Sequence, residues 1–452
     1  MRRVMAVAAG KTARFLSRRA GNRGSSLPGN LALRLDPGLA RHLASQVRGD
    51  VVVVTGTNGK TTTSNMISHI LRHSLRSVVS NAEGANMMGG VATALLAGSS
   101  LRGRLSADHA VLESDEGHFP AILEATDARL AVVTNFFRDQ LDRYGELDLT
   151  VRVVAGAMEK ARPYMVLNAD DPLTFSLSGC GPSFITYGIE TSRVKRPPSY
   201  ARESRFCPVC DRALVYDLYH YGQLGHYRCR ECGFTRPRPD VRAEDVVQET
   251  DGIRCRVVTS RGEVRLTLPL RGLYDLHNAL AATAASVRLG IDPESVMAAL
   301  STYRPATGRL ERFEHGGRGV YLNLVKNPTG FNEALGLLHS HRGSMDVLLA
   351  LNDNIADGRD VSWIYDADLE LLRDIQDRVG RVVCTGQRPE DMAVRVRYAG
   401  LDMDKVAVVD DYGQALARVL SGESEAVYVL ATYTALWPLE KLIRDRLGES
   451  AC

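Results

Sequence analysis

The sequence predicts an α/β protein in which parallel sheets carry helices on their faces. Three observations predict this class: short apolar runs bounded by turn residues alternate with helical patterns, one such run leads directly into a glycine-rich loop, and the alternation resumes after an interruption that contains paired cysteines. The length of 452 residues suits about three domains. A hydrophobic content of 44% is enough for sizeable cores.

The charges are nearly balanced, with 56 Lys and Arg against 53 Asp and Glu, which excludes a polybasic nucleic-acid-binding protein. The balance conceals an asymmetry, because residues 1–35 contain eight basic side chains and no acidic one, whereas the remainder carries 48 basic and 53 acidic side chains. We expect residues 1–48 to form a basic N-terminal helical segment. Its first helix is either solvated or in contact with an anionic membrane surface.

The sequence predicts no membrane-spanning helix, because no stretch approaches the roughly 18 consecutive apolar residues that a span requires. A secretion signal is not expected either, since Lys11 and Arg14 interrupt the apolar run at residues 4–10. We therefore expect a cytoplasmic protein, either free in the cytoplasm or at the inner face of the cell membrane.

The first α/β series predicts a nucleotide-binding central domain over residues 49–305. Its predicted strands lie at 51–55, 110–112, 130–134, 165–167 and 184–187, with helices at 61–71 and 148–162 among those between them. The composition shifts to Pro, Arg, Tyr and Cys from about residue 194 to 240, which indicates an inserted module over 199–239. A helix at 276–289 resumes the alternation, and RPATG at 304–308 ends it.

A second α/β series follows and predicts a C-terminal domain over residues 306–452. Its predicted strands lie at 320–325, 346–351, 381–385, 405–409 and 427–431, and its predicted helices at 332–341, 367–379 and 414–420.

The sharpest local motif is VVVVTGTNGKTTTSNMISHIL at 51–71, an apolar strand followed by a glycine-rich loop and a helix. Backbone N–H groups and the positive end of the helix favour a phosphate, Lys60 can neutralise its charge, and the Thr61 hydroxyl can hold Mg²⁺. The alternative is an ordinary tight turn. The predicted ATP-binding residues here are Gly56, Thr57, Asn58, Gly59, Lys60, Thr61 and Thr62.

Polar residues follow the next two strands of the predicted sheet. Glu113, Asp115 and Glu116 come after the strand at 110–112, and TNFFRDQLDRY, with Asn135, Asp139, Gln140 and Asp142, follows the strand at 130–134. Carboxyl ends of parallel strands meet at the edge where α/β proteins bind ligands, so a magnesium site is expected there. Taken singly, each residue is better explained as a cap or a solvated acid, and only the strand ends taken together favour a ligand site.

Two C-x-x-C pairs lie inside the interruption. Zinc favours four thiolates in a tetrahedron, and two such turns supply them without leaving a position open, which favours a structural site. The alternatives are reduced or disulfide-paired cysteines, and a mixed shell that uses His220 or His226. The predicted zinc ligands are Cys207, Cys210, Cys229 and Cys232.

Together these motifs resemble the Mur ligase superfamily of ATP-dependent amide-forming enzymes. TGTNGKTT matches its shortened phosphate loop, TNFFRDQLDRY its TN-x-x-x-DH-x-DRY segment, VLNADDP its NADD strand end, and GLYDLHNALAA its adenine-side motif. The resemblance implies a Mur ligase-like central P-loop ATPase domain with an inserted four-cysteine zinc ribbon, plus a C-terminal Rossmann-like α/β domain. It assigns phosphate and Mg²⁺ to Lys60 and Thr61, a second Mg²⁺ contact to Glu113, the adenine to Asn278, and the γ-phosphate to Arg309 and Lys326.

Departures from the superfamily pattern point to one branch. Gln140 replaces a metal-binding His, Asp275 replaces the first Asn of the adenine motif, and Ala155 stands where several relatives carry a carbamoylated Lys, which disfavours an amino-acid-adding ligase. With the four cysteines, NAEGAN, LVKNPTGFNEAL and LNDNIADGRDVSWIYDAD resemble the synthetase subunits of lipid II isoglutaminyl synthases, which work with a GatD-like glutamine amidotransferase.

That branch implies ATP-dependent amidation of the D-glutamate α-carboxylate of lipid II to D-isoglutamine through an acyl phosphate, with ATP, Mg²⁺ and structural Zn²⁺. Neither Cys180 nor Cys384 lies in the sharp elbow that a glutaminase nucleophile needs, so the ammonia is either free or supplied by a partner. The resemblance implies that Asp360 completes the partner's catalytic triad, with Asp353 and Asp357 as alternatives. The other interpretation of Asp360 is a cap on the following helix. A zinc-ribbon nucleic-acid protein is a rival that the acidic body disfavours, so no nucleic-acid partner is expected.

Overall fold

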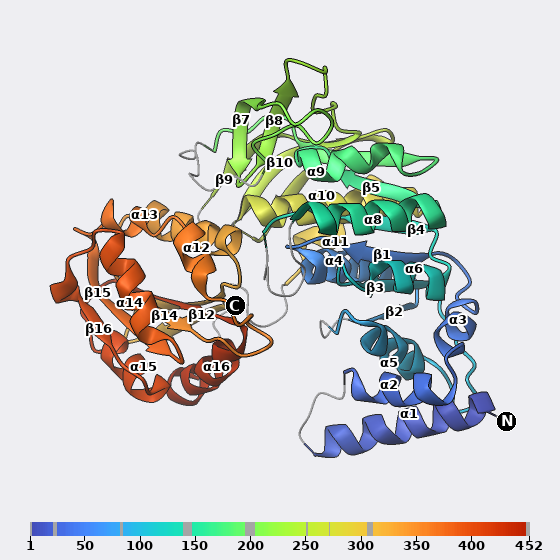
Figure 1. Ribbon diagram of the computed structural model, residues 1–452, viewed down its shortest axis with the longest axis horizontal. Coiled ribbons are helices and arrows are strands. Elements are labelled where there is room, and N and C mark those ends of the chain that lie inside the picture. Colours follow the sequence, from blue (N-terminus) through green and yellow to red (C-terminus); the bar gives the residue numbers. More distant parts are fainter. Residues whose placement is uncertain are drawn as a thin grey trace. The chain divides into compact units, whose positions relative to one another are not determined.

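The computed structural model describes residues 2–20, 25–81, 85–138, 147–194, 204–249, 252–270, 272–304 and 311–448 (Figure 1). The chain divides into two compact units. Apart from two short segments, the first unit extends to Arg304, and the second contains Pro305–Cys452.

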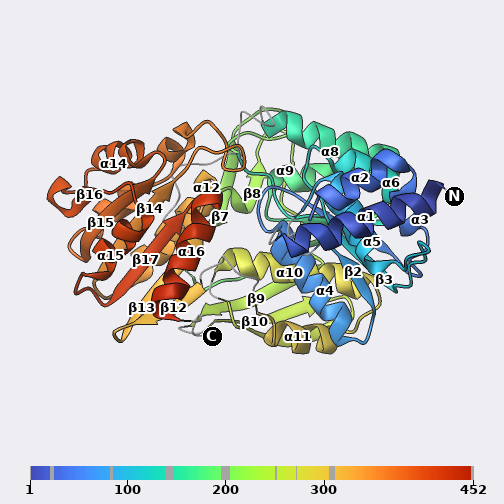
Figure 2. The same cartoon turned by 90° about the horizontal axis from the view of Figure 1, so that it is seen from below.

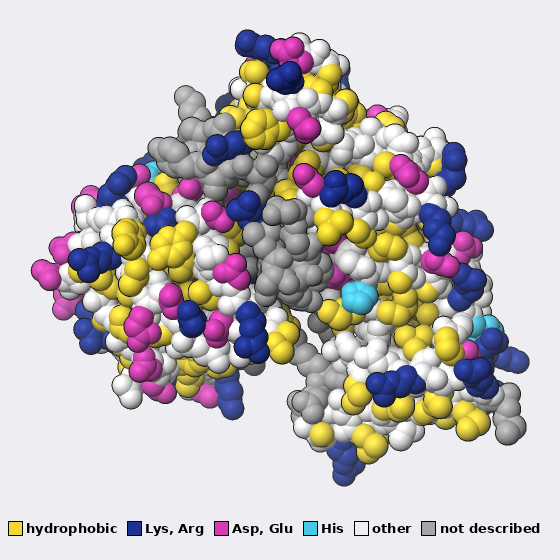
Figure 3. Space-filling model, in the orientation of Figure 1, with side chains coloured by type: hydrophobic (Ala, Val, Ile, Leu, Met, Phe, Trp, Pro, Cys, Tyr) yellow, Lys and Arg dark blue, Asp and Glu magenta, His cyan; other side chains and the backbone are white. Residues whose placement is uncertain are grey.

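Three helices form the N-terminal part of the first unit: α1 (Arg2–Arg19), α2 (Leu27–Leu35) and α3 (Leu39–Ala44). α1 buries Ala6, Val7 and Gly10 against its neighbours, and a Cβ atom at Gly10 would lie 2.8 Å from Leu96. Its other faces carry exposed apolar side chains among the basic ones, as Figure 3 shows for the N-terminal helices. Among the described residues, no helix has both the length and the apolar character required to span a bilayer.

The first unit is organised around a nine-stranded sheet with the order β11-β10-β9-β6-β5-β4-β1-β3-β2. Strands from β2 to β9 in this order are parallel, and β9, β10 and β11 are antiparallel. The strands are β1 (Val51–Thr55), β2 (Val78–Ser80), β3 (His109–Glu113), β4 (Leu130–Val133), β5 (Tyr164–Asn168), β6 (Phe184–Ile189), β9 (Val241–Gln248), β10 (Ile253–Thr259) and β11 (Gly262–Leu268).

Helices cover both faces of this sheet, which explains why β1 is apolar at every position before Thr55. Successive side chains of a strand point to opposite faces, and accordingly Val52 and Val54 belong to one core cluster whereas Val51 and Val53 belong to another. On the first face α4 and α10 pack together (Figure 2). The helices are α4 (Lys60–His73), α5 (Met88–Gly98), α6 (Phe119–Thr126), α8 (Leu147–Ala161), α9 (Pro172–Phe175), α10 (Leu273–Arg288) and α11 (Pro293–Ser301), with the 3-10 helix η1 (Ser176–Gly179).

An antiparallel hairpin projects from this unit between β6 and β9. It consists of β7 (Leu214–Tyr221) and β8 (Leu224–Cys229), which form a separate two-stranded sheet. The two C-x-x-C pairs lie at the open end of the hairpin, and the turn at Gly222 and Gln223 lies at the other end.

The second unit contains a six-stranded sheet with the order β12-β13-β17-β14-β15-β16, parallel except for β12. Its strands are β12 (Glu311–His315), β13 (Arg318–Leu324), β14 (Met345–Leu351), β15 (Val379–Gly386), β16 (Val406–Val408) and β17 (Ala426–Ala431). Its helices are α12 (Pro328–Ser340), α13 (Glu370–Arg373), α14 (Pro389–Tyr398), α15 (Tyr412–Leu420) and α16 (Tyr433–Leu447), with 3-10 helices η2 (Ser362–Asp366) and η3 (Met403–Lys405).

The predicted α/β class is confirmed, but the helix predicted at 367–379 is wrong. That segment contains the single helical turn α13, and residues 374–378 then form turns before β15. Leu369, Leu372 and Ile375 are buried at a spacing that also suits a helix, which explains the error. The start of the segment is fixed instead by hydrogen bonds between Asp368 and Asn332 of α12. Strands β9, β10 and β11, which extend the first sheet, were not predicted from the sequence.

Candidate nucleotide site and cysteine cluster

The glycine-rich loop joins the end of β1 to the start of α4 at the carboxyl edge of the first sheet. Gly56 and Gly59 have φ values of 115° and 84°, in the left-handed region that favours glycine. A Cβ atom would lie 2.4 Å from the Thr134 hydroxyl at Gly56, and 2.1 Å from the Asn278 side-chain oxygen at Gly59. Both positions therefore require glycine for conformation and for space.

Asn135 fixes the conformation of this loop. Its backbone carbonyl accepts a hydrogen bond from the Thr57 N–H (2.9 Å), and its side-chain amide bonds to both the N–H (2.9 Å) and the carbonyl (3.1 Å) of Asn58. The Thr57 hydroxyl in turn exchanges hydrogen bonds with the backbone of Phe137, each 3.1 Å long. The Thr57 and Asn58 amides face Asn135 in this conformation, so their contacts with phosphate remain a prediction.

Lys60 is buried and folds back over the loop. Its ammonium group donates to the carbonyl oxygens of Gly56 (2.6 Å) and Thr57 (3.1 Å) and lies 3.2 Å from a carboxylate oxygen of Glu116. The cation is therefore held inside the glycine-rich loop by oxygen atoms. Phosphate oxygens are acceptors of the same kind and could replace these neighbours as partners of the ammonium group.

Glu113 lies at the end of β3, where its backbone pairs with Val54 of β1. Asn81 bonds to both the N–H (2.7 Å) and the carbonyl (2.8 Å) of Glu113, and Asn86 donates to one carboxylate oxygen at 3.3 Å. Within the described residues the other carboxylate oxygen is buried with no hydrogen-bond donor. A buried oxygen of this kind is costly unless a cation binds it, so Glu113 fits a magnesium ligand. Thr61 lies half-buried in the first turn of α4.

The adenine-side motif lies on α10. Asn278 is buried and accepts a hydrogen bond from the Thr63 hydroxyl at 3.3 Å, which joins α10 to α4 beside the phosphate loop. Asp275, which departs from the superfamily pattern, accepts a hydrogen bond from the Gly272 N–H at 3.3 Å and caps the start of the helix. The structure thus brings Asn278 next to Gly59.

Several residues singled out from the sequence lie elsewhere or outside the described residues. Arg309, Asp139, Gln140 and Asp142 are outside them. Ala155 lies on α8 and packs against the core of the first unit. Lys326 is half-buried in the second unit, between β13 and α12.

The three candidate aspartates of the second unit differ in their surroundings. Asp360 is exposed, and hydrogen bonds from Ser362 at the start of η2 lower the pKa of its carboxyl. It accepts the first N–H of this 3-10 helix from the position before the N-cap residue, Val361. Asp357 is buried and accepts the Thr434 N–H of α16 at 2.7 Å. Asp353 lies 3.5 Å from Arg388.

The four cysteines of the insert form a compact cluster. The Sγ atoms of Cys207 and Cys232 are 3.5 Å apart, as are those of Cys210 and Cys229, and all four lie within 4.8 Å of one another without disulfide bonds. Zinc–sulfur bonds of about 2.3 Å in a tetrahedron fit this spacing. The alternative of a mixed shell is wrong, because His220 and His226 direct their Nε2 atoms at the Ile189 carbonyl, 3.2 and 2.9 Å away.

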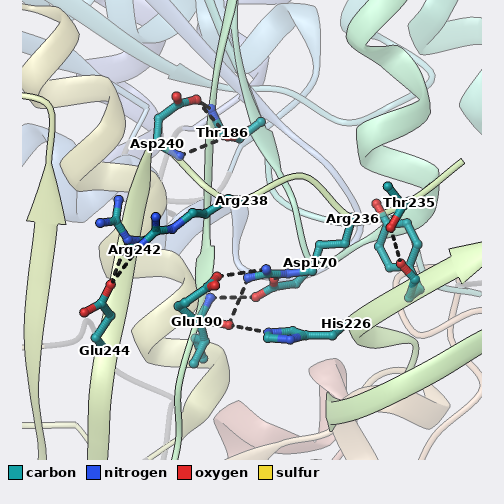
Figure 4. Close-up of polar contacts among 12 residues, drawn as sticks. Asp170, Thr186, Glu190, His226, Thr235, Arg236, Arg238, Asp240, Arg242 and Glu244 are labelled. Atoms are coloured by element: carbon teal, nitrogen blue, oxygen red, sulfur yellow. Dashed lines mark hydrogen bonds and ion pairs between the residues drawn. The ribbon is translucent and has the colours of Figure 1, made fainter.

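The structure adds a buried charged cluster that was not predicted from the sequence. Asp170, of the NADD strand end, contacts Arg236 of the insert at 2.6 Å (Figure 4). It also contacts His277 of α10 at 2.8 Å. Asp170 and His277 could have been found from the sequence, because both lie in motifs shared with the superfamily. Nothing in the local sequence singled out Arg236, because the contact joins residues far apart in the chain.

Comparison with known families matches both units. Residues 54–207 match the Mur ligase middle domain, and residues 324–436 match the MurT ligase C-terminal domain. Two solved structures share the fold. A pseudomurein peptide ligase type C from Methanothermus fervidus has a TM-score of 0.68 at 24% identity, covering 88% of this chain and 79% of that one. Mycobacterium tuberculosis folylpolyglutamate synthase, solved with ADP and AMPPCP, has a TM-score of 0.60 at 17% identity, covering 94% and 98%.

Two relatives match from end to end. The MurT subunit of lipid II isoglutaminyl synthase (glutamine-hydrolyzing) from Staphylococcus aureus (strain COL) is 36% identical over 449 residues, which is 99% of both chains. The subunit of the same name from Streptococcus pneumoniae (strain ATCC BAA-255 / R6) is 34% identical over 448 residues, covering 99% of this chain and 98% of that one. With this identity and coverage, the chain belongs to the MurT family of Mur ligase-like proteins.

Proposed function

We propose that this chain is the ATP-dependent synthetase subunit of a lipid II isoglutaminyl synthase in peptidoglycan synthesis. It amidates the α-carboxylate of D-glutamate in the lipid II stem peptide and so produces D-isoglutamine. The observation that carries the proposal is the phosphate loop with Glu113 at one sheet edge, in a chain that matches MurT subunits over 99% of its length.

The chemistry explains why such a site is needed. A carboxylate is a poor electrophile, so its oxygen first attacks the γ-phosphorus of ATP, which releases ADP and leaves an acyl phosphate. Ammonia then attacks the acyl carbon, phosphate departs, and the surplus proton leaves with solvent. We assign Lys60 to the β- and γ-phosphates, Asn278 to the adenine, and Arg309 and Lys326 to the γ-phosphate.

Magnesium would be held by Thr61 and Glu113. When bound, the ion would neutralise the phosphate charge that develops during transfer. The chain's own contribution is to present a buried carboxylate oxygen without a donor at the sheet edge, and Asn81 and Asn86 keep that carboxylate in place. The second ion, zinc, would be structural and held by the four clustered cysteines.

The described cysteines outside the cluster support an external source of ammonia. Burial raises the pKa of the Cys180 thiol, and raises the pKa values of Cys255 and Cys384 to about 12, so these thiols are protonated and poor nucleophiles at neutral pH. We therefore propose a GatD-like glutaminase as the partner. Asp360 is the triad residue we assign to this chain, because it is exposed and its lowered pKa keeps it ionised.

A further part of the proposal is contact with the anionic inner face of the membrane, where lipid II is presented. Phe15 and Leu16 of α1 are 62% and 58% exposed, and Val4 and Met5 are at least half exposed. Arginine and lysine side chains of the same helix accompany them, and α1 contains no acidic residue. Exposed apolar groups with basic neighbours favour an interfacial helix over a solvated one.

The purified chain with its partner, ATP, Mg²⁺, glutamine and lipid II tests the reaction. The expected product has the lower mass that results when an amino group replaces a hydroxyl group, and Lys60→Ala should abolish its formation. Absence of the product, under conditions where wild type and Lys60→Ala still differ in ATP turnover, would refute the substrate assignment. Turnover that instead requires an added amino acid would favour an amino-acid-adding ligase.

A further inference from the structure

The turn of the inserted hairpin is buried in the core of the first unit. Tyr221 and Leu224, which flank the turn, belong to the same core cluster as residues of α4 and α10. Gln223 between them is completely buried. Hairpin turns normally lie at the surface, where water satisfies their polar groups. The burial of an amide side chain at this tip therefore indicates that the tip contacts something specific.

Gln223 contacts the segment that fixes the phosphate loop. Its side-chain amide donates a hydrogen bond of 2.5 Å to the Phe136 carbonyl. The Phe136 N–H donates to the Asp171 carboxylate at 2.8 Å, so both backbone polar groups of Phe136 are held. The residues on either side, Asn135 and Phe137, are those that bond to the phosphate loop. The hairpin tip therefore contacts Phe136, which lies between the two residues that bond to the phosphate loop.

A second connection passes through Asp170, which is completely buried beyond the end of β5. One carboxylate oxygen accepts the Arg236 guanidinium at 2.6 Å and the other accepts His277 Nε2 at 2.8 Å, while the Asp170 carbonyl accepts the Gly225 N–H of β8 at 2.9 Å. His277 immediately precedes Asn278, the predicted adenine residue. The same aspartate therefore holds the insert on one side and α10 on the other.

The charges of this cluster suit a structural contact between the insert and α10 and do not suit a metal site. Burial alone would raise the pKa of Asp170, but Arg236 and the His277 hydrogen bond hold it well below its usual range. Arg236 also bonds to Glu190 at 2.9 Å, as Figure 4 shows. The ligand atoms of Asp170, His220 and His226 lie within 4.8 Å of one another, yet the resident guanidinium repels a second cation.

The strand β8 joins this anchored tip to the cysteine cluster. It begins at Leu224, beside the turn, and ends at Cys229, a predicted zinc ligand, roughly 17 Å away at the usual rise per residue. Small modules of this kind depend on their metal for folding. A metal at one end of the hairpin therefore stabilises the strand whose other end is bonded into the nucleotide site.

We propose that the insert positions the nucleotide site, and that metal bound by its cysteines sustains nucleotide affinity. Gln223 and the Asp170 cluster hold the phosphate loop and α10 in the geometry that binds ATP. The inference rests on the proposed ATP-dependent function and assigns the insert a part in it. Gln223 acts through Phe136, so it is a positioning residue.

Gln223→Leu tests the first connection, because leucine has a similar volume but donates no hydrogen bond. In the full chain with its partner, the Kd of a non-hydrolysable ATP analogue with Mg²⁺ and the KM for ATP should rise about 5- to 10-fold, the effect of one hydrogen bond to a buried acceptor. At saturating ATP, kcat should stay within about twofold of wild type, because the lost interaction is made before the transition state. Zinc content should be unchanged.

Arg228→Ala is the matched control, since Arg228 lies on β8 and forms an exposed ion pair with Asp217. It should leave the Kd of the analogue unchanged. Equal Kd values for wild type and Gln223→Leu would overturn the proposal. A fall in kcat with an unchanged KM would also overturn it. Because the readout is nucleotide binding, the result holds whichever acceptor the enzyme amidates.

A measurement on the wild-type chain tests the metal dependence without a variant. Hydrogen exchange of backbone amides at residues 51–60 is compared before and after zinc is removed with a chelator. Exchange in this segment should become faster together with exchange in the insert, and the Kd of the ATP analogue should rise. Unchanged exchange at 51–60, while the amides of the insert lose protection, would overturn the proposal even if Gln223→Leu does not fold.

Discussion

The Lys60 ammonium group lies 3.2 Å from the Glu116 carboxylate, and the two side chains are only 7% and 8% exposed. The two loop carbonyls that also accept from Lys60 carry no net charge, so Glu116 supplies a compensating charge. ATP phosphates would bring negative charge of their own to the same loop. We therefore expect Lys60 to exchange Glu116 for phosphate when nucleotide binds, so that the contribution of Glu116 to stability decreases.

Glu116→Gln should destabilise the chain in the absence of nucleotide by about 3–5 kcal/mol, because it removes the negative charge from a buried pair with the Lys60 ammonium. Bound ATP analogue supplies that charge, so the loss should shrink when the analogue saturates the site. Chemical denaturation with and without the analogue measures both values. Lys160→Ala, which breaks the exposed pair with Glu124, is the control and should leave the free energy of unfolding unchanged. An equal loss in the free energy of unfolding with and without the analogue would contradict the exchange of Glu116 for phosphate at Lys60.

Cys232→Ser should abolish stoichiometric zinc binding and lower the Tm of the chain. Cys232 is exposed, so the loss of the metal, and not the loss of packing, accounts for the change. Metal content is measured after gel filtration, together with thermal unfolding. Cys180→Ser, outside the cluster, should retain zinc. Full zinc content in Cys232→Ser would refute the four-thiolate shell.

The sequence predicted those parts of the site that are local in the chain. The loop, a helix start at Thr61 and a strand end at Leu112 follow from motifs and from the apolar pattern of β1 and β3, and each lies within one residue of its place in the structure. The hydrogen bonds from Asn135 to the phosphate loop depend on parallel pairing between β1 and β4, and Asn58, one of its partners, lies 77 residues away in the sequence. The contacts of Arg236 and Gln223 arise from the packing of an insert, which no local pattern encodes.

His220 should make the fold sensitive to acid. Burial lowers the pKa of this histidine to about 3, although Asp170 opposes the shift; the other groups that face it are Arg236, His226 and His277. The unfolded chain takes up a proton below its ordinary pKa near 6.5 and the folded chain does not, so stability is lost as pH falls from about 6.5 towards 3. His220→Gln should lack this pH-dependent loss of stability, because glutamine does not titrate.

Denaturation of wild type and His220→Gln at several pH values measures the effect. The stability advantage of wild type should be constant above about pH 7 and should decrease by about 1 kcal/mol per pH unit between about pH 6 and 3. An advantage that does not vary with pH would show that folding leaves the pKa of His220 unchanged, and would contradict the prediction.

Phe15→Glu should weaken binding to vesicles that contain anionic lipid, because it removes apolar area and adds a negative charge to α1. Phe15 is 62% exposed, so the fold and ATP turnover in detergent should be unaffected. Co-sedimentation with anionic and with neutral vesicles is the measurement. Val408→Glu, at an exposed apolar site of the second unit, is the control. Equal sedimentation of wild type and Phe15→Glu with anionic vesicles would favour a solvated helix.

Asp360→Asn should separate the two half-reactions of the complex. Asparagine still accepts the hydrogen bond from Ser362 through its side-chain oxygen, so the start of η2 is preserved while the negative charge is lost. If that charge orients a partner histidine, glutamine-dependent amidation should fall by about 10³- to 10⁴-fold, whereas amidation with added ammonium salts should continue at the wild-type rate. Asp353→Asn, next to Arg388, is the matched control and should leave both rates near wild type. Gel filtration with the partner shows whether the complex still forms, and an intact complex with full glutamine-dependent activity in Asp360→Asn would leave this aspartate with the role of a helix cap alone.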